Sequence, residues 1–444
     1  MLLYVTITER IKKLLKVTWG IMSETNKEEY KRLKSNFISL TALQAANYIL
    51  PLITLPYLVK TLGVEYFGLL AFATATIAYF GILTDYGFNL TASKEISIHR
   101  ENREKIIEIF SSVMSIKFIL LLLSFTLLSL LVFSINKFSE HWEIYLLTFG
   151  TVVGQFLFPV WFFQGMERMK YTTYLNLLSK AIFTISIFIV VKEENDAYLV
   201  PLLLSTGAIV AGGASLYLIH KEFNIPFKIQ NTTTIKHYLI DGWHVFLSRF
   251  YVSLYTTTNI LLLGLMTNNI AVGYYSIVEK IVLAIGGLFQ PVNQTIYPYL
   301  ARKYRENFET YINFLKKIAL LFIVSASVFV LCAEFFSKEL IYLIHGEYNM
   351  HISMLLTIFL LRILLMPFGA LLSNTLIIME RKTEFIKVMN YTVLIDLLIV
   401  PLAIYYYHEQ GLIISFLLIL LMHTLFLWYF VNQAIRTERI QHDS

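Results

Sequence analysis

The sequence predicts an all-α polytopic membrane protein with about 12 transmembrane helices, in two six-helix bundles related by a pseudo-two-fold axis. Of its 444 residues, 57% are hydrophobic and only 15% are charged, whereas about a quarter of the residues of an average soluble domain are charged. The apolar residues form repeated blocks of about 20, the length that crosses a ~30 Å hydrocarbon core as a helix. This composition excludes a disordered chain and argues against a soluble enzyme.

Twelve apolar runs, each bounded by charge clusters, are predicted to span the membrane. Their approximate limits are 37–59, 66–88, 113–135, 143–165, 174–192, 198–219, 243–265, 271–298, 318–337, 352–379, 386–408 and 411–433. The connections on the side away from the amino terminus are all short. A membrane enzyme that acts on an external sugar or lipid usually carries its catalytic groups on loops. The short connections therefore argue against an enzyme.

Basic residues predict the orientation of these spans. Segments on the amino-terminal side hold 27 of the 36 Lys and Arg residues, and the opposite side holds four, Lys60, Lys137, Lys192 and Lys338. Cytoplasmic segments of membrane proteins carry an excess of Lys and Arg. Both termini are therefore predicted to be cytoplasmic and the number of spans to be even. The net charge of +6 then reflects topology and not nucleic-acid binding.

The spans divide the chain into five predicted parts. These are a cytoplasmic amino-terminal segment (1–36), a first six-helix bundle (37–219), a cytoplasmic linker (220–242), a second six-helix bundle (243–433) and a cytoplasmic tail (434–444). Residues 1–21 are too short and too charged to span a membrane. Either they form an interfacial amphipathic helix or translation begins at Met22.

Sequence motifs for nucleotide-dependent, metal-dependent or hydrolytic chemistry are absent. There is no GxxxxGK[ST], HExxH or GxSxG pattern. The ten histidines have no Cys or carboxylate partner at ligand spacing, and Cys332 is the only cysteine, which excludes a disulfide framework and a CxxC metal site. We therefore expect no catalytic residue, cofactor or metal. Polar groups within the spans are the remaining candidates for a binding site.

Five basic residues lie inside predicted spans, where each costs about 2.5–3.5 kcal/mol at the bilayer centre. Lys117 and Lys180 lie within about two turns of the cytoplasmic end and are predicted to snorkel to the membrane surface. Arg249 lies in a polar, aromatic run, SRFYVSLYTTTN (248–259), that is typical of a cavity wall. Lys280 and Arg362 lie near the middle of their spans. Arg249, Lys280 and Arg362 are therefore the predicted anion-binding residues.

Neighbouring residues refine the predictions for Lys280 and Arg362. Gly287 and Gln294 follow Lys280 at intervals of seven, which returns to nearly the same helix face. Lys280 and Gln294 are thus predicted to face a central cavity, with an ion pair to Glu279 or another span as the alternative for Lys280. For Arg362, ligand contact and pairing with Asp396 on the next span are equally good explanations, because an unpaired buried charge is costly.

A polar stripe marks the first span. Gln44, Asn47, Tyr48 and Pro51 recur at helical spacing on an otherwise apolar helix. Gln44 and Asn47 are predicted to line the cavity, and hydrogen bonding between helices is the alternative explanation.

A weak internal repeat relates residues 36–88 to positions 205 further along the chain. It aligns Gly68 with Gly273 and Gly81 with Gly286. Such a repeat favours two six-helix halves with the substrate site between them, as in many transporters.

Four stretches carry a resemblance to a known family. They are LTDYGFNLTASKEIS (83–97), FPVWFFQGMERMKY (158–171), VGYYSIVEKI (272–281) and QPVNQTIYPYLARKY (290–304). From about residue 36 to 430, the chain resembles the Wzx-type O-antigen or polysaccharide repeat-unit flippases of the multidrug/oligosaccharidyl-lipid/polysaccharide exporter superfamily.

This resemblance implies two six-helix bundles around a cationic cavity lined by spans 1, 2, 7 and 8, in the bacterial cytoplasmic (inner) membrane. The implied substrate is an undecaprenyl-pyrophosphate-linked oligosaccharide for O-antigen or capsule, moved to the outer leaflet by alternating access. A proton or sodium gradient would couple to transport, and a polysaccharide polymerase and chain-length regulator would be partners. Asp85 then lies near the cytoplasmic gate, and Asp85, Glu279 and Asp396 are the candidates for gating or ion coupling.

Two alternative functions stay open from the sequence. A multidrug/cation antiporter of the same superfamily would use acidic cavity groups, and a multi-pass polysaccharide polymerase would need a large outward loop. The proposed cargo fits the cationic residues, because a pyrophosphate cannot cross the low-dielectric core without compensation of its charge.

Overall fold

The computed structural model describes residues 27–443, without the side chains of residues 27–46, 255–256, 295 and 440–443. The predictions for residues 1–21 lie outside the described residues, and so does the side chain of Gln44. Within residues 27–443 the chain forms helices and no strand.

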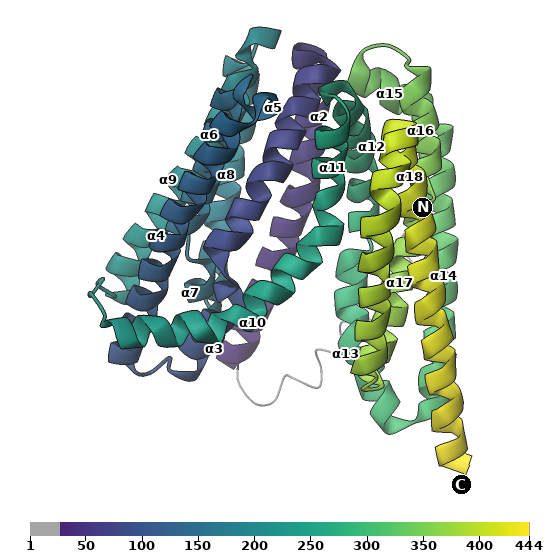
Figure 1. Cartoon of the computed structure of the whole chain (residues 1–444). Coiled ribbons are helices and arrows are strands. Elements are labelled where there is room, and N and C mark those ends of the chain that lie inside the picture. The colour runs from purple at the N-terminus through teal and green to yellow at the C-terminus, as the bar shows by residue number, and fades with distance from the viewer. Residues whose placement is uncertain (1–26, 444) are drawn as a thin grey trace.

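Two groups of upright helices stand side by side (Figure 1). The amino-terminal group consists of α2 (Lys27–Asp85), α3 (Phe88–Ile98), α4 (Arg103–Ser134), α5 (Asn136–Ser139), α6 (Trp142–Leu157), α7 (Val160–Gly165), α8 (Met169–Val190), the 3₁₀ helix η1 (Glu194–Tyr198) and α9 (Leu199–Phe223). The carboxy-terminal group consists of α11 (Thr258–Met266), α12 (Asn269–Gly287), α13 (Gln290–Glu306), α14 (Phe308–Phe335), α15 (Ser337–His345), α16 (Met350–Leu360), α17 (Arg362–Ile378) and α18 (Lys382–Asp443). Helix α10 (Thr232–Thr256) crosses the lower end of the first group and leads into the second.

Nine helical stretches of the described residues are long and apolar enough to cross a membrane, so the chain is a multi-pass membrane protein. Two of them, Asn47–Ile98 and Lys382–Arg439, contain 52 and 58 residues, more than twice the ~20 that one crossing needs. Each is interrupted by non-helical backbone, at Gly63 (φ 75°) and at His408 (φ 49°). Glycine adopts a positive φ without steric cost, which explains the turn at Gly63. The break at Gly63 falls between predicted spans 1 and 2, and the break at His408 falls at the last residue of predicted span 11.

Predicted spans 7 and 8 are each interrupted in the structure. Span 7 (243–265) is divided between α10 and α11 at Thr257, and α10 is not one of the candidate spans. Span 8 (271–298) is divided between α12 and α13, where the backbone N–H groups of Leu288 and Phe289 form tight turns to Ile285 and Gly286. Pro291 follows in the first turn of α13, where its missing N–H is tolerated. An apolar run alone does not reveal such breaks.

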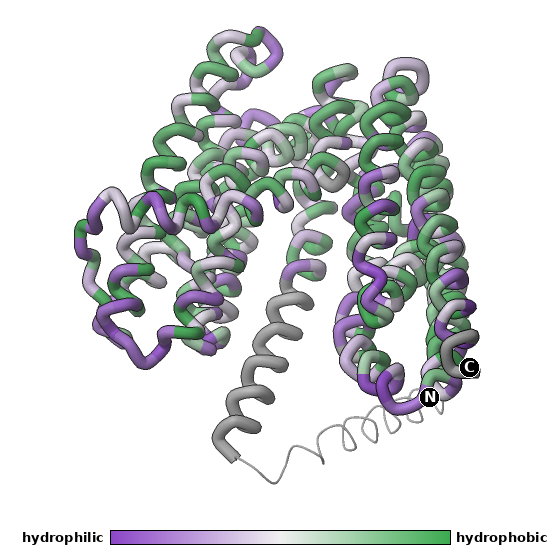
Figure 2. Tube along the Cα trace, turned by 60° about the horizontal axis from the view of Figure 1, so that its bottom comes forward, coloured by the Kyte–Doolittle hydropathy of each residue, from purple (hydrophilic) through white to green (hydrophobic). Residues whose placement is uncertain are grey.

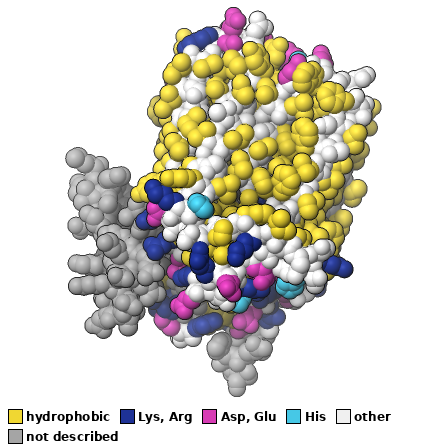
Figure 3. Space-filling view, turned by 90° about the vertical axis from the view of Figure 1, so that its left-hand side faces the viewer, with side chains coloured by type: hydrophobic (Ala, Val, Ile, Leu, Met, Phe, Trp, Pro, Cys, Tyr) yellow, Lys and Arg dark blue, Asp and Glu magenta, His cyan; other side chains and the backbone are white. Residues whose placement is uncertain are grey.

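The two ends of the helices differ in charge. Helices α3 and α7 and the carboxyl terminus lie at the lower end in Figure 1, and α5 and α15 lie at the upper end. Figure 3 shows an apolar belt on the outer face of the amino-terminal group, with most of the Lys and Arg side chains of that view below it. Figure 2, in which the lower end comes forward, shows polar connections there. We call the lower end the basic end.

The two groups meet along α2 and α12. A Cβ atom on Gly68 would lie 1.8 Å from the backbone oxygen of Asn269 and 2.6 Å from the nitrogen of Gly273. The two glycines that the internal repeat aligns therefore touch, and only glycine allows the two backbones to approach so closely. Nearby, the Lys137 ammonium donates to the backbone oxygen of Thr267 at 2.7 Å. The contact between the groups is thus tightest at the upper end.

Candidate functional site

A stripe of three residues on α12 runs along α2. Gly273, Lys280 and Gly287 recur every seven residues and so share a helix face. A Cβ on Gly273 would meet Val64, and one on Gly287 would meet the ring of Tyr48. Between them, the Lys280 ammonium lies 5.7 Å from the centre of the Phe67 ring. Lys280 therefore lies in the seam between the two groups, near the middle of α12.

Lys280 has the exposure and the free charge of a binding residue. Its side chain is exposed, although residues 275–278 just before it are buried. Among the described residues no carboxylate forms an ion pair with Lys280, so the predicted alternative of a pair with Glu279 is not realised. An ammonium over an aromatic ring retains donors for an anionic ligand.

The polar stripe of span 1 meets the end of α12. The Tyr48 hydroxyl donates to Gln290 Oε1 at 2.9 Å, and Asn47 is half-buried beside it on α2. Gln294 is exposed on α13. Tight turns at Leu288 and Phe289 separate Gln294 from α12, and its place on the helix face of Lys280 stays a prediction.

A cavity of about 540 Å³ lies inside the carboxy-terminal group, among α11, α12, α17 and α18. It brings together three of the predicted residues, Glu279, Arg362 and Asp396. Other polar residues that line it are Asn259, Ser373, Thr392 and His423. Adjacent residues of α12 therefore serve different spaces, since Lys280 lies in the seam and Glu279 in the cavity.

The charged groups of this cavity are only partly satisfied. Glu279 accepts a hydrogen bond from the Tyr275 hydroxyl at 3.1 Å. The Arg362 guanidinium lies over Phe416, 4.6 Å from its centre, and its Nε and Nη1 atoms have no hydrogen-bond partner. Asp396 is 3% exposed, and its Oδ2 atom also lacks a partner. Arg362 and Asp396 thus share the cavity without the direct ion pair that one sequence-based explanation required.

Unsatisfied polar atoms give the cavity a defined chemistry. Buried polar groups almost always have a hydrogen-bond partner. An ion, a proton, water or a small polar ligand would therefore satisfy the unpartnered atoms of Arg362 and Asp396. Arg362 supplies donors, and Glu279 and Asp396 supply acceptors. Among the side chains that the structure describes, no group of three His, Cys, Asp or Glu is placed to hold a metal ion.

Asp85 is engaged in a buried ion pair at the end of α2. Its Oδ1 atom accepts from Asn89 Nδ2 at 2.7 Å and lies 3.7 Å from the Lys117 ammonium. Lys117 is only 2% exposed, so the prediction that it snorkels to the membrane surface is wrong. The sequence pattern missed this pair because the two residues lie on different helices. The one signal was a lysine inside the apolar run of α4.

Arg249 lies on α10, which is fixed to the amino-terminal group. The ring of Phe246, one turn before Arg249, stacks on Tyr86 at 5.0 Å between centres. Arg249 itself is exposed, and no ion pair involves it among the described residues. Two residues further on, the Tyr251 hydroxyl donates to Asn390 Oδ1 on α18 at 3.1 Å. Helix α10 therefore contacts both groups.

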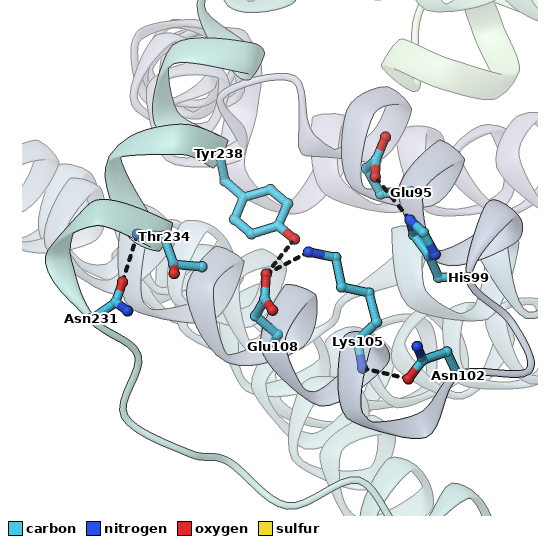
Figure 4. A network of polar contacts seen from close by, with 8 residues as sticks. All are labelled: Glu95, His99, Asn102, Lys105, Glu108, Asn231, Thr234 and Tyr238. Atoms are coloured by element: carbon cyan, nitrogen blue, oxygen red, sulfur yellow. Dashed lines mark hydrogen bonds and ion pairs between the residues drawn. The ribbon is translucent and has the colours of Figure 1, made fainter.

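The start of α10 is anchored by the polar network in Figure 4. The Tyr238 hydroxyl donates to Glu108 Oε1 at 3.1 Å, and the Lys105 ammonium donates to the same oxygen at 2.7 Å. Asn231 caps the helix by accepting from the Thr234 N–H at 2.8 Å. Burial, together with the charge of Glu108, raises the pKa of Tyr238 to about 12. The hydroxyl therefore stays protonated and keeps donating at neutral pH.

Comparison with known proteins gives matches over most of the chain. The family model described as "Polysaccharide biosynthesis protein" matches residues 33–304. A putative O-antigen transporter of Escherichia coli K12 is 34% identical over 269 residues, which are 61% of this chain and 65% of that protein. A putative O-antigen transporter of Shigella dysenteriae is 27% identical over 394 residues, 87% of this chain and 96% of that protein.

Solved transporter structures share the fold. An inward-facing multidrug resistance MATE family transporter of the MOP superfamily superimposes with a TM-score of 0.67 at 13% identity, over 90% of this chain and 98% of that chain. The lipid II flippase MurJ, in an inward closed conformation, superimposes with a TM-score of 0.70 at 16% identity, over 90% of this chain and 88% of that chain. These relatives and structures are described as transporters or flippases, in line with the prediction of a transporter and not an enzyme.

Proposed function

The chain belongs to the polysaccharide biosynthesis protein family, and we propose that it is a flippase for undecaprenyl-pyrophosphate-linked oligosaccharide repeat units of O-antigen or capsule. In this proposal twelve crossings of the bacterial cytoplasmic (inner) membrane place both termini and the basic end in the cytoplasm. The names of the relatives support a lipid-linked saccharide as cargo. A polysaccharide polymerase and a chain-length regulator would receive the product.

The position of Lys280 is the observation that carries this proposal. Its exposed ammonium lies in the seam between the two groups at the middle of α12. A pyrophosphate that enters a low-dielectric slab needs a compensating cation, and an ammonium binds phosphate as a compact point charge. Lys280 is proposed to take the pyrophosphate, with Arg249, Asn47, Gln44 and Gln294 closer to the sugars, while the polyprenyl tail stays in lipid.

The uneven contact between the groups supports a mechanism of alternating access. The glycine contact of α2 with α12 closes the upper end, so the cargo is proposed to enter from the basic end and to leave when that contact opens. Glu279, Arg362 and Asp396 are proposed to couple the change to a proton or sodium gradient, since their cavity adjoins the seam through α12. Asp85, paired with Lys117, is proposed to act at the cytoplasmic gate.

Export in a strain that lacks its own flippase tests the role of Lys280. We expect Lys280→Ala to reduce surface polysaccharide about 10-fold or more at equal membrane abundance, because a hydrogen bond to a charged group contributes about 1.5–3 kcal/mol. Lys280→Arg, which keeps the charge, should retain most export. Lys338→Ala removes an exposed lysine at the upper end and serves as the matched control. Normal export with both Lys280→Ala and Arg362→Ala would refute a cationic site.

A second candidate, a multidrug/cation antiporter, is favoured by the two carboxylates in the cavity. Cationic drugs would pair with Glu279 and Asp396. In that case neutralising Asp85, Glu279 and Asp396 abolishes drug efflux while Lys280→Ala leaves it intact. Loss of polysaccharide export with Lys280→Ala, in cells with unchanged drug resistance, separates the two functions in favour of the flippase.

A further inference from the structure

An apolar crevice of about 530 Å³ opens on the outer face of the amino-terminal group. Its walls are side chains of α4, α6 and α9, and of the segment that follows α9, including Met114, Phe118, Phe156, Ile219 and Phe227. Only Ser115 and His220 add polar groups. Phe118 and Phe227 are about half exposed, at 48% and 56%, so the crevice faces outward. It is separate from the seam and from the charged cavity.

One basic residue lines this crevice, and three more lie close to its lining residues in sequence or through a hydrogen bond. His220 belongs to the lining, and the adjacent Lys221 is exposed. Arg103 and Lys228 are also exposed. Three exposed acidic residues, Glu101, Glu104 and Glu222, lie close to them in sequence. Figure 3 shows this side of the molecule, with apolar side chains above and Lys and Arg side chains, interspersed with Asp, Glu and His, below.

Two hydrogen bonds hold the segment 224–231 against α4 and so complete the crevice. Arg103 Nη2 donates to the backbone oxygen of Asn224 at 2.8 Å, and the Lys228 N–H donates to Ser111 Oγ at 2.9 Å. Between these two anchors, Ile225 is buried in the core and Phe227 lines the crevice. The shape of the crevice is therefore fixed by the protein.

We propose that this crevice binds one anionic glycerophospholipid, such as phosphatidylglycerol, from the leaflet at the basic end. One acyl chain occupies the apolar crevice, and the phosphate lies at the rim formed by His220, Lys221 and Lys228. Any lipid could fill an apolar crevice in a bilayer, but basic pockets at the ends of membrane helices select anionic headgroups. The charge of the rim thus determines which lipid binds.

Lipid binding at this place would act on α10. The segment 224–231 that closes the crevice ends at Asn231, the cap of α10, and Tyr238 fixes the next turns to Glu108. Because α10 leads from the first group into the second, a bound lipid stabilises the position of the connection between them. The proposal concerns a lipid of the bilayer and does not depend on the identity of the cargo.

Native mass spectrometry of the full-length protein with added phosphatidylglycerol or phosphatidylcholine tests the headgroup. We expect preferential retention of phosphatidylglycerol, and Lys221→Gln with Lys228→Gln should weaken its binding about 30-fold, since each lysine near an anionic surface contributes about a fivefold attraction. Lys192→Gln with Lys338→Gln removes two exposed lysines of the upper end and should change nothing. Equal retention of both lipids by the wild type, or equal loss in both double variants, would overturn the proposal.

A second pair of variants tests the acyl chain. Ile119→Trp places a larger side chain at an exposed position, 59% accessible, that lines the crevice, and should reduce phosphatidylglycerol retention. Ile189→Trp, on a residue of α8 that is 67% exposed and does not line the crevice, should leave it unchanged. Undecaprenyl phosphate that displaces phosphatidylglycerol at equal concentration would assign the crevice to a polyprenyl chain and would refute this proposal. Failure to displace it supports the phospholipid.

Discussion

At the scale of single residues, the structure shows three ways of holding a charge within a membrane helix. Lys117 is buried and neutralised by Asp85, Arg362 stacks on aromatic rings in a cavity, and Lys280 is exposed in the seam. A buried charge is tolerated only with a partner or with access to water. Only the last two keep donors for a ligand, and this makes them better binding candidates than Lys117.

The Asp85–Lys117 pair predicts an asymmetric response to neutralisation. Asp85→Asn leaves the ammonium of Lys117, which is 2% exposed, without its counter-ion. It should lower the free energy of unfolding by about 3 kcal/mol, the lower end of the range for breaking a buried pair. Lys117→Met leaves Asp85 with 19% exposure and its bond from Asn89, so it should cost less. The double variant should recover most of the loss. Thermal melts in detergent measure this double-mutant cycle.

An exposed pair provides the control for that cycle. Glu309→Gln breaks the ion pair of Glu309 with Arg439, whose side chains are 61% and 49% exposed. Exposed pairs contribute about 0–1 kcal/mol, so this variant should melt nearly as the wild type does. Equal effects of Asp85→Asn and Glu309→Gln would contradict the assignment of a buried pair.

Residue type predicted the candidate site better than residue spacing did. Glu279, Arg362 and Asp396 were identified because ionisable groups are rare inside apolar runs, and the structure places all three around one cavity. Spacing correctly placed Lys280 and Gly287 on one face of α12, and for Gln294, beyond the tight turns, it stays a prediction. The partner of Asp85 was missed, because contacts between different helices leave no local pattern.

At the scale of helices, α10 is the element that the sequence described least well. Its polar, aromatic run predicts part of a membrane span, yet α10 ends at Thr256 and packs on the amino-terminal group through Tyr238 and Phe246. The predicted spans 113–135, 174–192 and 318–337 fall largely within α4, α8 and α14, although α4 and α14 begin ten residues earlier. The position of a long apolar helix can be predicted from its composition alone, whereas the position of a helix with polar faces depends on the residues that it packs against.

The anchor of α10 predicts a pH-dependent effect of Tyr238→Phe. The pKa of Tyr238 is raised from 10.0 to about 12, so the stabilisation from its bond to Glu108 is fully present below pH 10 and is lost as the pH rises through 12. Tyr238→Phe should therefore cost about 1.5 kcal/mol at neutral pH, as expected for a hydrogen bond to a charged acceptor. The difference between the two melting curves should shrink between pH 10 and 12. Tyr342→Phe, on an exposed tyrosine, should show no difference at any pH.

The crossing of α2 and α12 predicts an effect of one methyl group. Gly68→Ala would place a carbon 1.8 Å from the backbone oxygen of Asn269, so the helices must separate, and overpacking of this kind costs about 1–3 kcal/mol. Gly213→Ala in α9 meets nothing within 4 Å and should be neutral or slightly stabilising. Thermal melts of the two variants compare them directly. Equal stability of both would show that the close approach of α2 and α12 is not required.

At the scale of the whole molecule, the contacts that join the two groups are concentrated at the upper end. Gly68 and Gly273 touch there, the ring of Phe72 fills the space beside Gly264, and the Lys137 ammonium donates to the backbone of the other group. Lower down, the bond of Tyr48 with Gln290 and that of Tyr251 with Asn390 join single side chains. A change that opens the upper end must therefore break backbone packing together with the Lys137 bonds.

Lys137 is the side chain whose removal should shift the equilibrium between a closed and an open upper end. It donates to the oxygens of Thr267 at 2.7 Å and Leu265 at 3.4 Å, at the carboxyl end of α11, where the helix dipole favours a cation. Lys137→Met removes these bonds and, at about 1–2 kcal/mol, should raise the population with an open upper end about 5- to 30-fold.

Distances between pairs of spin labels measure this population, after Cys332→Ser has removed the single cysteine. Labels at Glu140 and Tyr348 should show a longer distance, and labels at Glu101 and Arg305 at the basic end a shorter one. Lys338→Met should leave both distances unchanged, and an unchanged distribution in Lys137→Met would show that packing alone holds the upper end closed.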